Sequence, residues 1–285
     1  MMKTLLLVDG SNLLFQMFYG MPSRIVNHDG IAIQGVIGFL GALRKIIAMT
    51  EPTHIGVFFD GECQNERKTL DADYKANRPS FEDTPEEELP FAQQPYIESA
   101  LDLLGIRHKE TDSCEVDDWI AAYVATFRCD IRIVIASFDS DFFQLVSDTV
   151  SVLRYRGNAT VLVTPDVICE KFGIAPSQYA DFKSLVGDTA DNIKGIRGIG
   201  AKTASALLAA YGSLDGLFEN LQGVTPPRLR ASLEEGVDRL TLNRALIRLT
   251  GSVPIPYALD ELAYRHVPFR TTELLLKLGL QKSRE

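Results

Sequence analysis

Long apolar runs are missing from this 285-residue sequence. The longest, such as LLLV and IRIVIA, are far too short to cross a bilayer, which excludes a membrane-spanning protein. The N-terminal apolar stretch LLLV is broken at once by Asp9, so it predicts a first strand and not a signal peptide. The four cysteines show no CxxC spacing, which favours reduced thiols and a cytoplasmic protein.

Basic residues are also scarce. The chain has 29 Lys and Arg against 38 Asp and Glu, so its formal net charge is −9. Such a balance by itself argues against a nucleic-acid partner, because phosphate binding normally needs a basic surface. However, nine acids that recur in motifs equal the whole deficit, and divalent cations among them would leave the rest of the chain near neutral. Net charge therefore does not decide the partner.

These motif acids occur where a strand end, a turn or a helix start would aim them into a cleft. No Cys or His joins them, so the ligands would all be oxygen, which suits Mg²⁺ or Mn²⁺ rather than zinc. So many carboxylates cannot ionise together in one pocket unless cations neutralise them. The acids are Asp9, Asp60, Glu115, Asp117, Asp118, Asp139, Asp141, Asp188 and Asp191.

Strand-like and helical patterns alternate over the first 165 residues, which predicts a mainly parallel α/β sheet with helices on both faces. Asp112, three residues ahead of Glu115, is the predicted N-cap of one helix. Ligand sites of such sheets lie beyond the carboxyl ends of the strands. Asp9, Asp60 and the Asp139–Asp141 pair all follow predicted strands there. Strands are predicted in LLLVD, HIGVFFD, IRIVIAS, SVLRY and TVLVT, and helices in GVIGFLGALRKII, YIESALDLLGI and CEVDDWIAAYVATF.

A lone Asp after a strand is more often a turn or cap residue than a metal ligand. The doublets shift that balance, since SFDSD places two acids at one strand end. GDTADN places Asp188 and Asp191 on one face if that turn is helical. In EVDDW, Glu115 and Asp118 share a helix face while Asp117 points elsewhere, so one of the three would act through water.

After Thr164 strand-like runs stop, and the chain is predicted to be helical, with a domain boundary near residue 165. In GIRGIGAKTA, three glycines precede a helix that is expected to begin near Ala201, with Lys202 in its first turn. Exposed amides at such a start can cradle a phosphate. A plain glycine connector is the alternative. A Walker motif is excluded because no GxxxxGK(S/T) follows a strand, and a Rossmann fingerprint is excluded because no strand is predicted to lead into these glycines. The functional interpretation is a hairpin that grips a nucleic-acid backbone without reading bases.

The polar stretch between residues 63 and 95 contains YKANRP, with Arg67 and Lys68 nearby. Bases beside an aromatic could engage phosphate and stack a nucleobase. The same composition fits a solvated surface loop, and the residues alone leave both interpretations open. The second half of the stretch, FEDTPEEEL, carries five acids and no base, which could change substrate preference.

In order along residues 3–255, the motifs VDGSNLLF, FFDG, YKANRP, EVDDW, SFDSDFFQL and GDTADNIKGIRGIGAKTA resemble the 5′-nuclease (flap endonuclease) family. That family includes the N-terminal domain of bacterial DNA polymerase I and stand-alone bacterial and phage exonucleases. Since no polymerase domain follows, a stand-alone member is expected. The resemblance implies a PIN-like catalytic domain over 1–165 with a helical arch at about 63–95. A helical DNA-binding domain over 166–285, with a helix-three-turn-helix (helix-hairpin-helix-like) region at about 182–212, would follow.

The resemblance also implies roles for single residues. Asp118 matches bacterial and phage members but not every branch. Lys75 and Arg78 match arch bases that steer the scissile phosphate. One metal would be held by Asp9, Asp60, Glu115 and Asp117, and a second by Asp139, Asp141, Asp188 and Asp191. DNA contacts would come from Tyr19, Arg67, Tyr74, Lys75, Arg78, Gly198, Gly200 and Lys202. A potassium ion or phosphate would lie on the hairpin at Gly195, Ile196, Gly198, Ile199 and Gly200.

The function that the resemblance implies is a Mg²⁺- or Mn²⁺-dependent 5′-3′ exonuclease and flap endonuclease in DNA replication and repair. Its substrates would be DNA with 5′ flaps, nicks or 5′ ends, RNA-primed ends included, and it would be a cytoplasmic monomer that joins the bacterial nucleoid on DNA. A DNA-binding paralogue with weak nuclease activity would lack the metal acids. A PIN-type ribonuclease would need no duplex-gripping hairpin, and a metal-dependent phosphatase would have neither hairpin nor arch.

Overall fold

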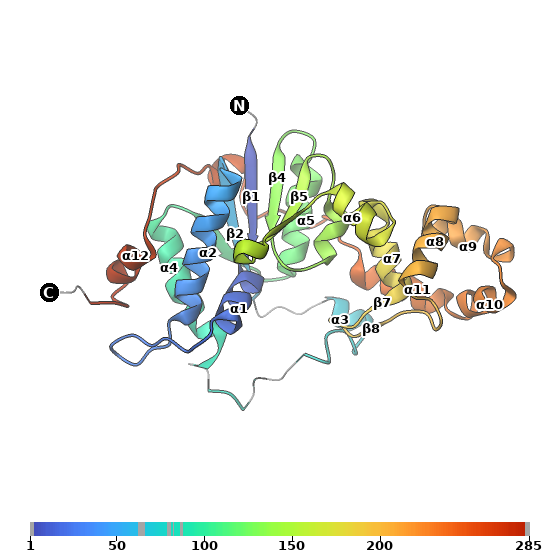
Figure 1. Cartoon of the computed structure of the whole chain (residues 1–285), viewed down its shortest axis with the longest axis horizontal. Coiled ribbons are helices and arrows are strands. Elements are labelled where there is room, and N and C mark those ends of the chain that lie inside the picture. The colour runs from blue at the N-terminus through green and yellow to red at the C-terminus, as the bar shows by residue number, and fades with distance from the viewer. Residues whose placement is uncertain (1–2, 62–65, 79–80, 82, 86–87, 283–285) are drawn as a thin grey trace.

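The computed structural model describes residues 3–61, 66–78, 81, 83–85 and 88–282. Residues 63–65, 79, 80, 82, 86 and 87 of the expected arch lie outside the described residues, so the arch is seen only in part. Figure 1 shows a central sheet between two groups of helices, with a further helical group extending to one side. The strand order is β3-β2-β1-β4-β5-β6, in which β6 alone is antiparallel to its neighbour. The strands are β1 Thr4–Asp9, β2 His54–Phe59, β3 Arg107–Glu110, β4 Arg132–Ala136, β5 Val150–Arg154 and β6 Val161–Val163.

Both faces of the central strands β1, β2 and β4 are buried. Successive side chains of a strand point to opposite faces, so each face has its own apolar core. Leu5 and Leu7 of β1 pack into one apolar core, and Leu6 and Val8 pack into the other. Apolar strands therefore need helices on both sides. The Leu6 side is covered by α1 Gly10–Gly20, α2 Gln34–Thr50, α4 Gln94–Leu103 and α12 Thr271–Lys277. The Leu5 side is covered by α5 Val116–Phe127, α6 Pro165–Phe172 and α7 Tyr179–Val186.

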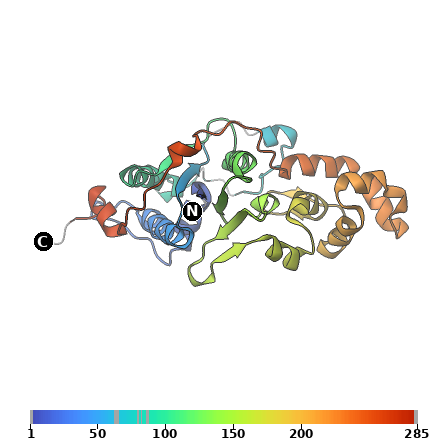
Figure 2. The same cartoon turned by 90° about the horizontal axis from the view of Figure 1, so that it is seen from above.

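The further helical group extends away from the sheet, as the view from above shows (Figure 2). Its apolar side chains belong to the Leu5-side core. That core runs unbroken across the expected boundary near residue 165, from Val163 through Ile168 to Leu207, so the division into two domains stays a prediction. The group consists of α8 Ala201–Tyr211, α9 Leu214–Glu219, α10 Pro227–Glu235 and α11 Val237–Ile247. The shorter helices are α3 Glu66–Leu70, η2 Pro90–Gln93, η3 Asp141–Leu145, η4 Gly157–Ala159, η5 Pro176–Gln178, η6 Leu221–Gly223 and η7 Leu259–Leu262.

The predicted fold class is confirmed, and three local expectations were incomplete or wrong. Helix α1, which directly follows β1, was not predicted, because GSN at its start has the composition of a turn. The N-cap of α5 is Glu115 and not Asp112. Asp118, three residues later, accepts a hydrogen bond from the Glu115 amide at 3.2 Å, which closes a capping box. Asp112 lies exposed, outside the helix.

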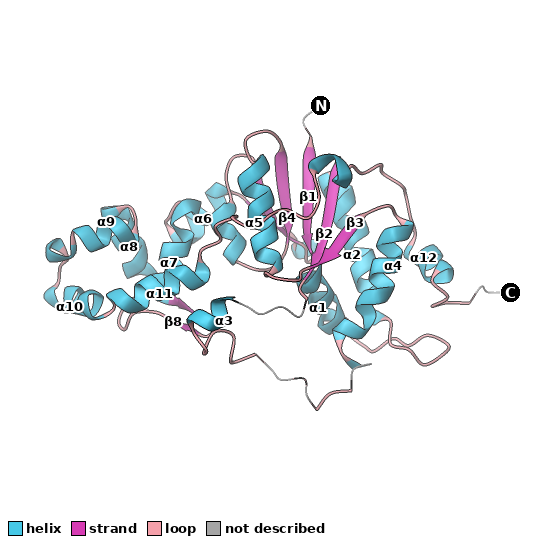
Figure 3. Ribbon diagram, turned by 180° about the vertical axis from the view of Figure 1, so that it is seen from behind, coloured by secondary structure: helices cyan, strands magenta, loops and turns pink. Residues whose placement is uncertain are grey.

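The turn that carries Asp188 and Asp191 is not helical. It joins two short antiparallel strands, β7 Gly187–Asp188 and β8 Ile193–Lys194, both labelled in Figure 1. Figure 3 shows β8 from behind, next to α11. Gly187 has φ 89°, and a Cβ atom there would lie 2.4 Å from the Gly195 amide nitrogen. Only glycine permits this close approach of two backbones. No helix in the described part of the chain is both long and apolar enough to cross a membrane.

Candidate active site at the carboxyl edge of the sheet

Asp9 and Asp60 lie at the carboxyl ends of adjacent strands. Asp9 ends β1 and caps α1, because its Oδ1 accepts a hydrogen bond from the Asn12 amide at 3.0 Å. The hydroxyl of Ser137, beyond the neighbouring strand β4, donates to Asp9 Oδ2 at 2.8 Å. Asp60 follows β2 and accepts from the Val116 amide at 2.9 Å, which ties it to the first turn of α5. Parallel pairing thus brings acids 51 positions apart to one edge.

Two of the three acids of EVDDW share one partner, and the third points elsewhere. Glu115 and Asp118 both contact Arg67, with Arg67–Glu115 at 2.5 Å and Arg67–Asp118 at 2.7 Å. Asp117 faces the strand-end acids, since its electrostatic neighbours include Asp139 and Asp9. The structure therefore brings Asp117 to the acidic edge and ties Asp118 to a guanidinium.

Asp139 and Asp141 occupy the loop that follows β4. Asp139 Oδ1 accepts a hydrogen bond from the Asp141 amide at 2.8 Å, which fixes the two acids in one tight turn. The negative charge of Asp139 contributes to the raised pKa values of Asp9 and Asp117 as well as that of Asp141. Its charge therefore acts both on the strand-end acids and on the group that contains Asp141.

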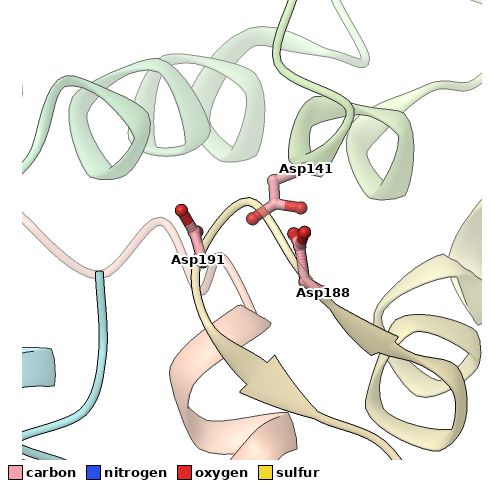
Figure 4. Close-up of side chains that lie close together, drawn as sticks. All are labelled: Asp141, Asp188 and Asp191. Atoms are coloured by element: carbon pink, nitrogen blue, oxygen red, sulfur yellow. The ribbon is translucent and has the colours of Figure 1, made fainter. Parts of the chain in front are cut away.

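The second group is Asp141, Asp188 and Asp191, whose carboxylate oxygens lie within 4.8 Å of one another. Figure 4 shows the three side chains converging, Asp141 from η3 and the other two from the β7–β8 turn. Asp188 Oδ1 accepts from the Ala190 amide at 2.9 Å, which orients it in that turn. An all-oxygen set of this kind fits a hard divalent cation.

Like charge and burial shift the acidity of these groups together. Burial, followed by repulsion from Asp60, raises the pKa of Asp9 to about 7. Burial raises the pKa of Asp141 to about 7 as well, although the Lys183 ammonium opposes that rise. Burial, followed by repulsion from Asp139, holds the pKa of Asp117 well above its usual range. Burial also raises the pKa of Asp60. Without cations these carboxyl groups therefore take up protons readily. Bound divalent cations would stabilise their charged form.

Lys183 on α7 is a site residue that sequence reasoning missed. Its ammonium contacts both Asp141 and Asp188, and only 7% of the residue is exposed. A signal was present, because Lys183 lies four residues after Tyr179 and one after Phe182, on the face of the helix that packs inward. A lysine on such a face requires a buried partner.

The first described part of the expected arch, residues 66–78, contacts the acidic edge and is called the arch foot below. Lys75 Nζ lies 2.6 Å from Glu115 Oε1, and Arg78 Nη2 lies 3.1 Å from Asp191 Oδ1. The backbone is held as well, since the Lys75 amide donates to the Asp191 carbonyl at 3.0 Å. The Arg78 side chain keeps 56% of its surface exposed, so it is anchored at the mouth of the site.

Two residues expected to contact DNA are buried instead. Tyr74 is 4% exposed, and its hydroxyl approaches Glu115 at 3.5 Å and Asp191 at 3.4 Å. Its ring packs with Ala180, Ile193, Leu246 and Ile247, so no face is open for stacking on a base. Arg67 is 9% exposed and bound to Glu115 and Asp118. Both side chains hold the arch foot against the site.

The glycine hairpin, residues 195–200, is anchored by its side chains and open along its backbone. Ile196 and Ile199 are buried, whereas Gly198, Gly200 and Lys202 are exposed. Helix α8 begins at Ala201, as predicted, directly after the hairpin. Gly195 packs tightly, since a Cβ atom there would lie 2.2 Å from the Val186 carbonyl carbon.

Tyr19 lies at the end of α1 with 60% of its surface exposed. Its ring centroid is 5.1 Å from that of Phe18 and 6.0 Å from that of Phe15. Phe15 in turn contacts Phe91 of η2, with centroids 5.0 Å apart. Tyr19 is therefore the open end of an aromatic cluster.

Comparison with known proteins places this geometry in a family. Residues 4–173 match the family described as 5′-3′ exonuclease, N-terminal resolvase-like domain, and residues 174–269 match 5′-3′ exonuclease, C-terminal SAM fold. The chain belongs to the 5′-3′ exonuclease family. Members of this family are hydrolases that act on DNA. The acidic edge lies beyond the carboxyl ends of the strands, where α/β sheets carry their ligand sites.

Among relatives, the chain is 34% identical over 268 residues to DNA polymerase I of Streptococcus pneumoniae, covering 92% of this chain and 30% of that protein. It is 37% identical over 264 residues to DNA polymerase I of Mycobacterium bovis, covering 91% and 28%. The chain thus spans less than a third of the length of these relatives. A solved complex of the flap endonuclease of bacteriophage T5 with DNA and metal ions has the same fold. Its TM-score is 0.70 at 20% identity, and the match covers 97% of this chain and all of that one.

Proposed function

We propose that this protein hydrolyses DNA phosphodiester bonds near 5′ ends and at flap junctions, using two divalent cations, Mg²⁺ or Mn²⁺. The observation that carries the proposal is the convergence of the motif acids on one edge of the sheet, in two groups that Asp139 joins. The family membership and the T5 nuclease complex with DNA and metal ions support it.

In this proposal, one cation lies among Asp9, Asp60, Glu115 and Asp117, and the other among Asp139, Asp141, Asp188 and Asp191. Divalent cations in such a pair supply acidification of water and stabilisation of charge on a leaving oxygen. Asp118 acts indirectly, because its contact with Arg67 holds the start of α5 and the arch foot together. Ser137 also acts indirectly, because its hydroxyl donates a hydrogen bond to Asp9 and so orients that carboxylate.

Two basic side chains of the protein stabilise negative charge on the substrate. Lys75 and Arg78 border the acids from the arch side, so a scissile phosphate between them would meet positive charge as its own charge develops. The Lys75 ammonium stays protonated, because Glu115 and the acids around it raise its pKa despite burial. No histidine is required as a general base.

The DNA duplex is held away from the reaction. Open amides of the glycine hairpin and Lys202 contact one phosphodiester backbone without reading bases. A potassium ion on the carbonyls of that hairpin would add positive charge at the same place. Tyr19 stacks on a terminal base, for which its exposed ring is suited.

A single-turnover assay on 5′-flap, nicked and blunt DNA and on a single-stranded RNA tests the proposal. We expect Mg²⁺-dependent cleavage of the DNA substrates near the 5′ end or junction and none in EDTA. Asp60→Ala and Asp141→Ala should lower the rate by about a hundredfold or more, since even indirect metal supports are worth about 10–100-fold. Asp130→Ala, which removes an exposed acid in the turn after α5, is the matched control.

Fluorescence anisotropy with the same flap DNA shows whether the variants still bind. Loss of cleavage with binding retained supports the assigned roles. Wild-type protein that binds DNA but yields no Mg²⁺-dependent product would mark a DNA-binding paralogue, and cleavage of the RNA alone would mark a ribonuclease.

A further inference from the structure

A cavity of about 300 Å³ opens beside the acidic edge, between the β5–β6 pair, η3 and α6. Its size is at the lower end of the range of small-molecule sites, about 300–1,000 Å³. Phe138, Phe143 and Phe172 line it together with Arg154, Arg156 and Lys171. Flat apolar surface and positive charge therefore meet in one concave site.

The cavity is lined by positive charge, whereas the protein as a whole is negatively charged. None of the described acids lines it, although the net charge of the protein is −9. Within the described part of the chain, Arg154, Arg156 and Lys171 form no ion pair, whereas Lys75, Arg78 and Lys183 all pair with carboxylates. Three cations without carboxylate partners around one cavity favour an anionic ligand.

Arg154 is held in place by aromatic rings and a carbonyl group. Its guanidinium carbon lies 5.2 Å from the ring centroid of Phe138 and 5.7 Å from that of Phe143. Its Nη2 donates to the Phe138 carbonyl at 2.9 Å. Lys171 Nζ similarly lies 5.1 Å from the ring centroid of Phe172. A cation fixed in this way loses little freedom when an anion binds.

The wall of the cavity is also the wall of the acidic site. Phe138 directly precedes Asp139, and Phe143 lies two residues after Asp141. The Phe138 amide donates to Asn12 Oδ1 at 2.9 Å, so this loop is tied to α1. A ligand in the cavity would lie along the same carboxyl edge, one strand farther from the centre of the sheet.

We propose that this cavity binds a phosphomonoester joined to a planar base, that is, a 5′-mononucleotide unit. The phosphate would contact Arg156, Lys171 and the guanidinium of Arg154. The base would lie against the apolar part of the lining, beside Phe138 and the exposed side chain of Val161. The unit comes from one of two sources with the same chemistry: a free mononucleotide, or the 5′-phosphorylated end of a DNA strand. This site goes beyond the proposed function and does not depend on cleavage.

Isothermal titration calorimetry in EDTA tests the proposal with deoxyadenosine 5′-monophosphate as the probe. The double variant Arg156→Ala/Lys171→Ala should weaken binding about tenfold or more, since a charged hydrogen bond is worth a factor of that order. Arg44→Ala/Lys45→Ala removes the same two residue types from the exposed side of α2 and should leave binding unchanged. Deoxyadenosine and inorganic phosphate should each bind more weakly than the nucleotide. Equal affinity in the two double variants, or no binding to wild type, would overturn the proposal.

A second arm separates the two sources. Nicked duplexes with a 5′-phosphate or a 5′-hydroxyl at the nick are titrated into both double variants in EDTA. A loss confined to the 5′-phosphate duplex in Arg156→Ala/Lys171→Ala identifies a DNA end as the ligand, and a loss seen only with the free nucleotide identifies a released product. Equal thermal melting of the two double variants confirms that neither is misfolded. Because nothing is cleaved in EDTA, failure of the proposed nuclease activity is detected separately.

Discussion

Replacement of Lys183 by methionine tests the electrostatics of the acidic site most severely. Lys183 and Asp141 are both 7% exposed, and the Asp188 side chain is 13% exposed, so solvent screens their interaction little. Methionine keeps the unbranched stem and removes the charge, which leaves two buried carboxylates without their cation. Breaking a buried pair in this way costs about 3–5 kcal/mol, a large part of the 5–15 kcal/mol that holds a typical domain folded.

Urea unfolding in EDTA at pH 8 measures this cost. We expect Lys183→Met to lower the free energy of unfolding by about 3–5 kcal/mol and Lys194→Met, at an exposed position on β8, by less than about 0.5 kcal/mol. Adding Asp141→Asn to Lys183→Met should restore part of the loss, because one uncompensated carboxylate is then gone. A Lys183→Met protein as stable as the wild type would refute the reasoning.

Three further outcomes follow from the structure. The folded-state pKa of Asp9, about 7, exceeds its ordinary value of 3.8, so the folded protein holds the extra proton and loses stability as pH rises through that window. In EDTA the free energy of unfolding should therefore fall between pH 4 and pH 7, by up to about 4 kcal/mol from this group, and Asp9→Asn should flatten the slope in urea titrations. Gly195→Ala should destabilise the protein in the same assay, because its Cβ meets backbone at 2.2 Å, whereas Gly200→Ala, with open space around it, should be tolerated. Tyr19→Ala should weaken DNA binding about tenfold in anisotropy without shifting the thermal midpoint, given that base stacking is worth about 1–3 kcal/mol; unchanged binding would remove Tyr19 from the interface.

The sheet and its acidic edge could be predicted from the sequence because both rest on short-range patterns. Apolar runs such as IRIVIA identify buried parallel strands, and the direction of those strands puts Asp9, Asp60 and Asp139 at one edge whatever the details of packing. The start of α8 followed from local glycine chemistry in the same way.

Other features depend on contacts between distant segments, and the sequence pattern carries little sign of them. Tyr74 is buried because the arch foot packs against α7, β8 and α11, more than 100 residues later. The segments on either side of the Asp188–Asp191 turn pair as the strands β7 and β8, because Gly187 lies against Gly195. The spacing of the acids in the sequence does not reveal this contact. The inward-facing position of Lys183 is visible in the sequence, but its partners are not, since Asp141 and Asp188 lie in a separate loop and a separate turn.

The central claim is that two groups of carboxylates each hold a divalent cation and act together on DNA. Counting Mn²⁺ bound per chain by electron paramagnetic resonance, alongside single-turnover cleavage of a 5′-flap duplex, tests it directly. We predict two Mn²⁺ ions and rapid cleavage in the wild type, and one Mn²⁺ ion with cleavage lost in Asp141→Ala/Asp188→Ala. A single ion in the wild type, or an unchanged count and rate in the double variant, would contradict the account.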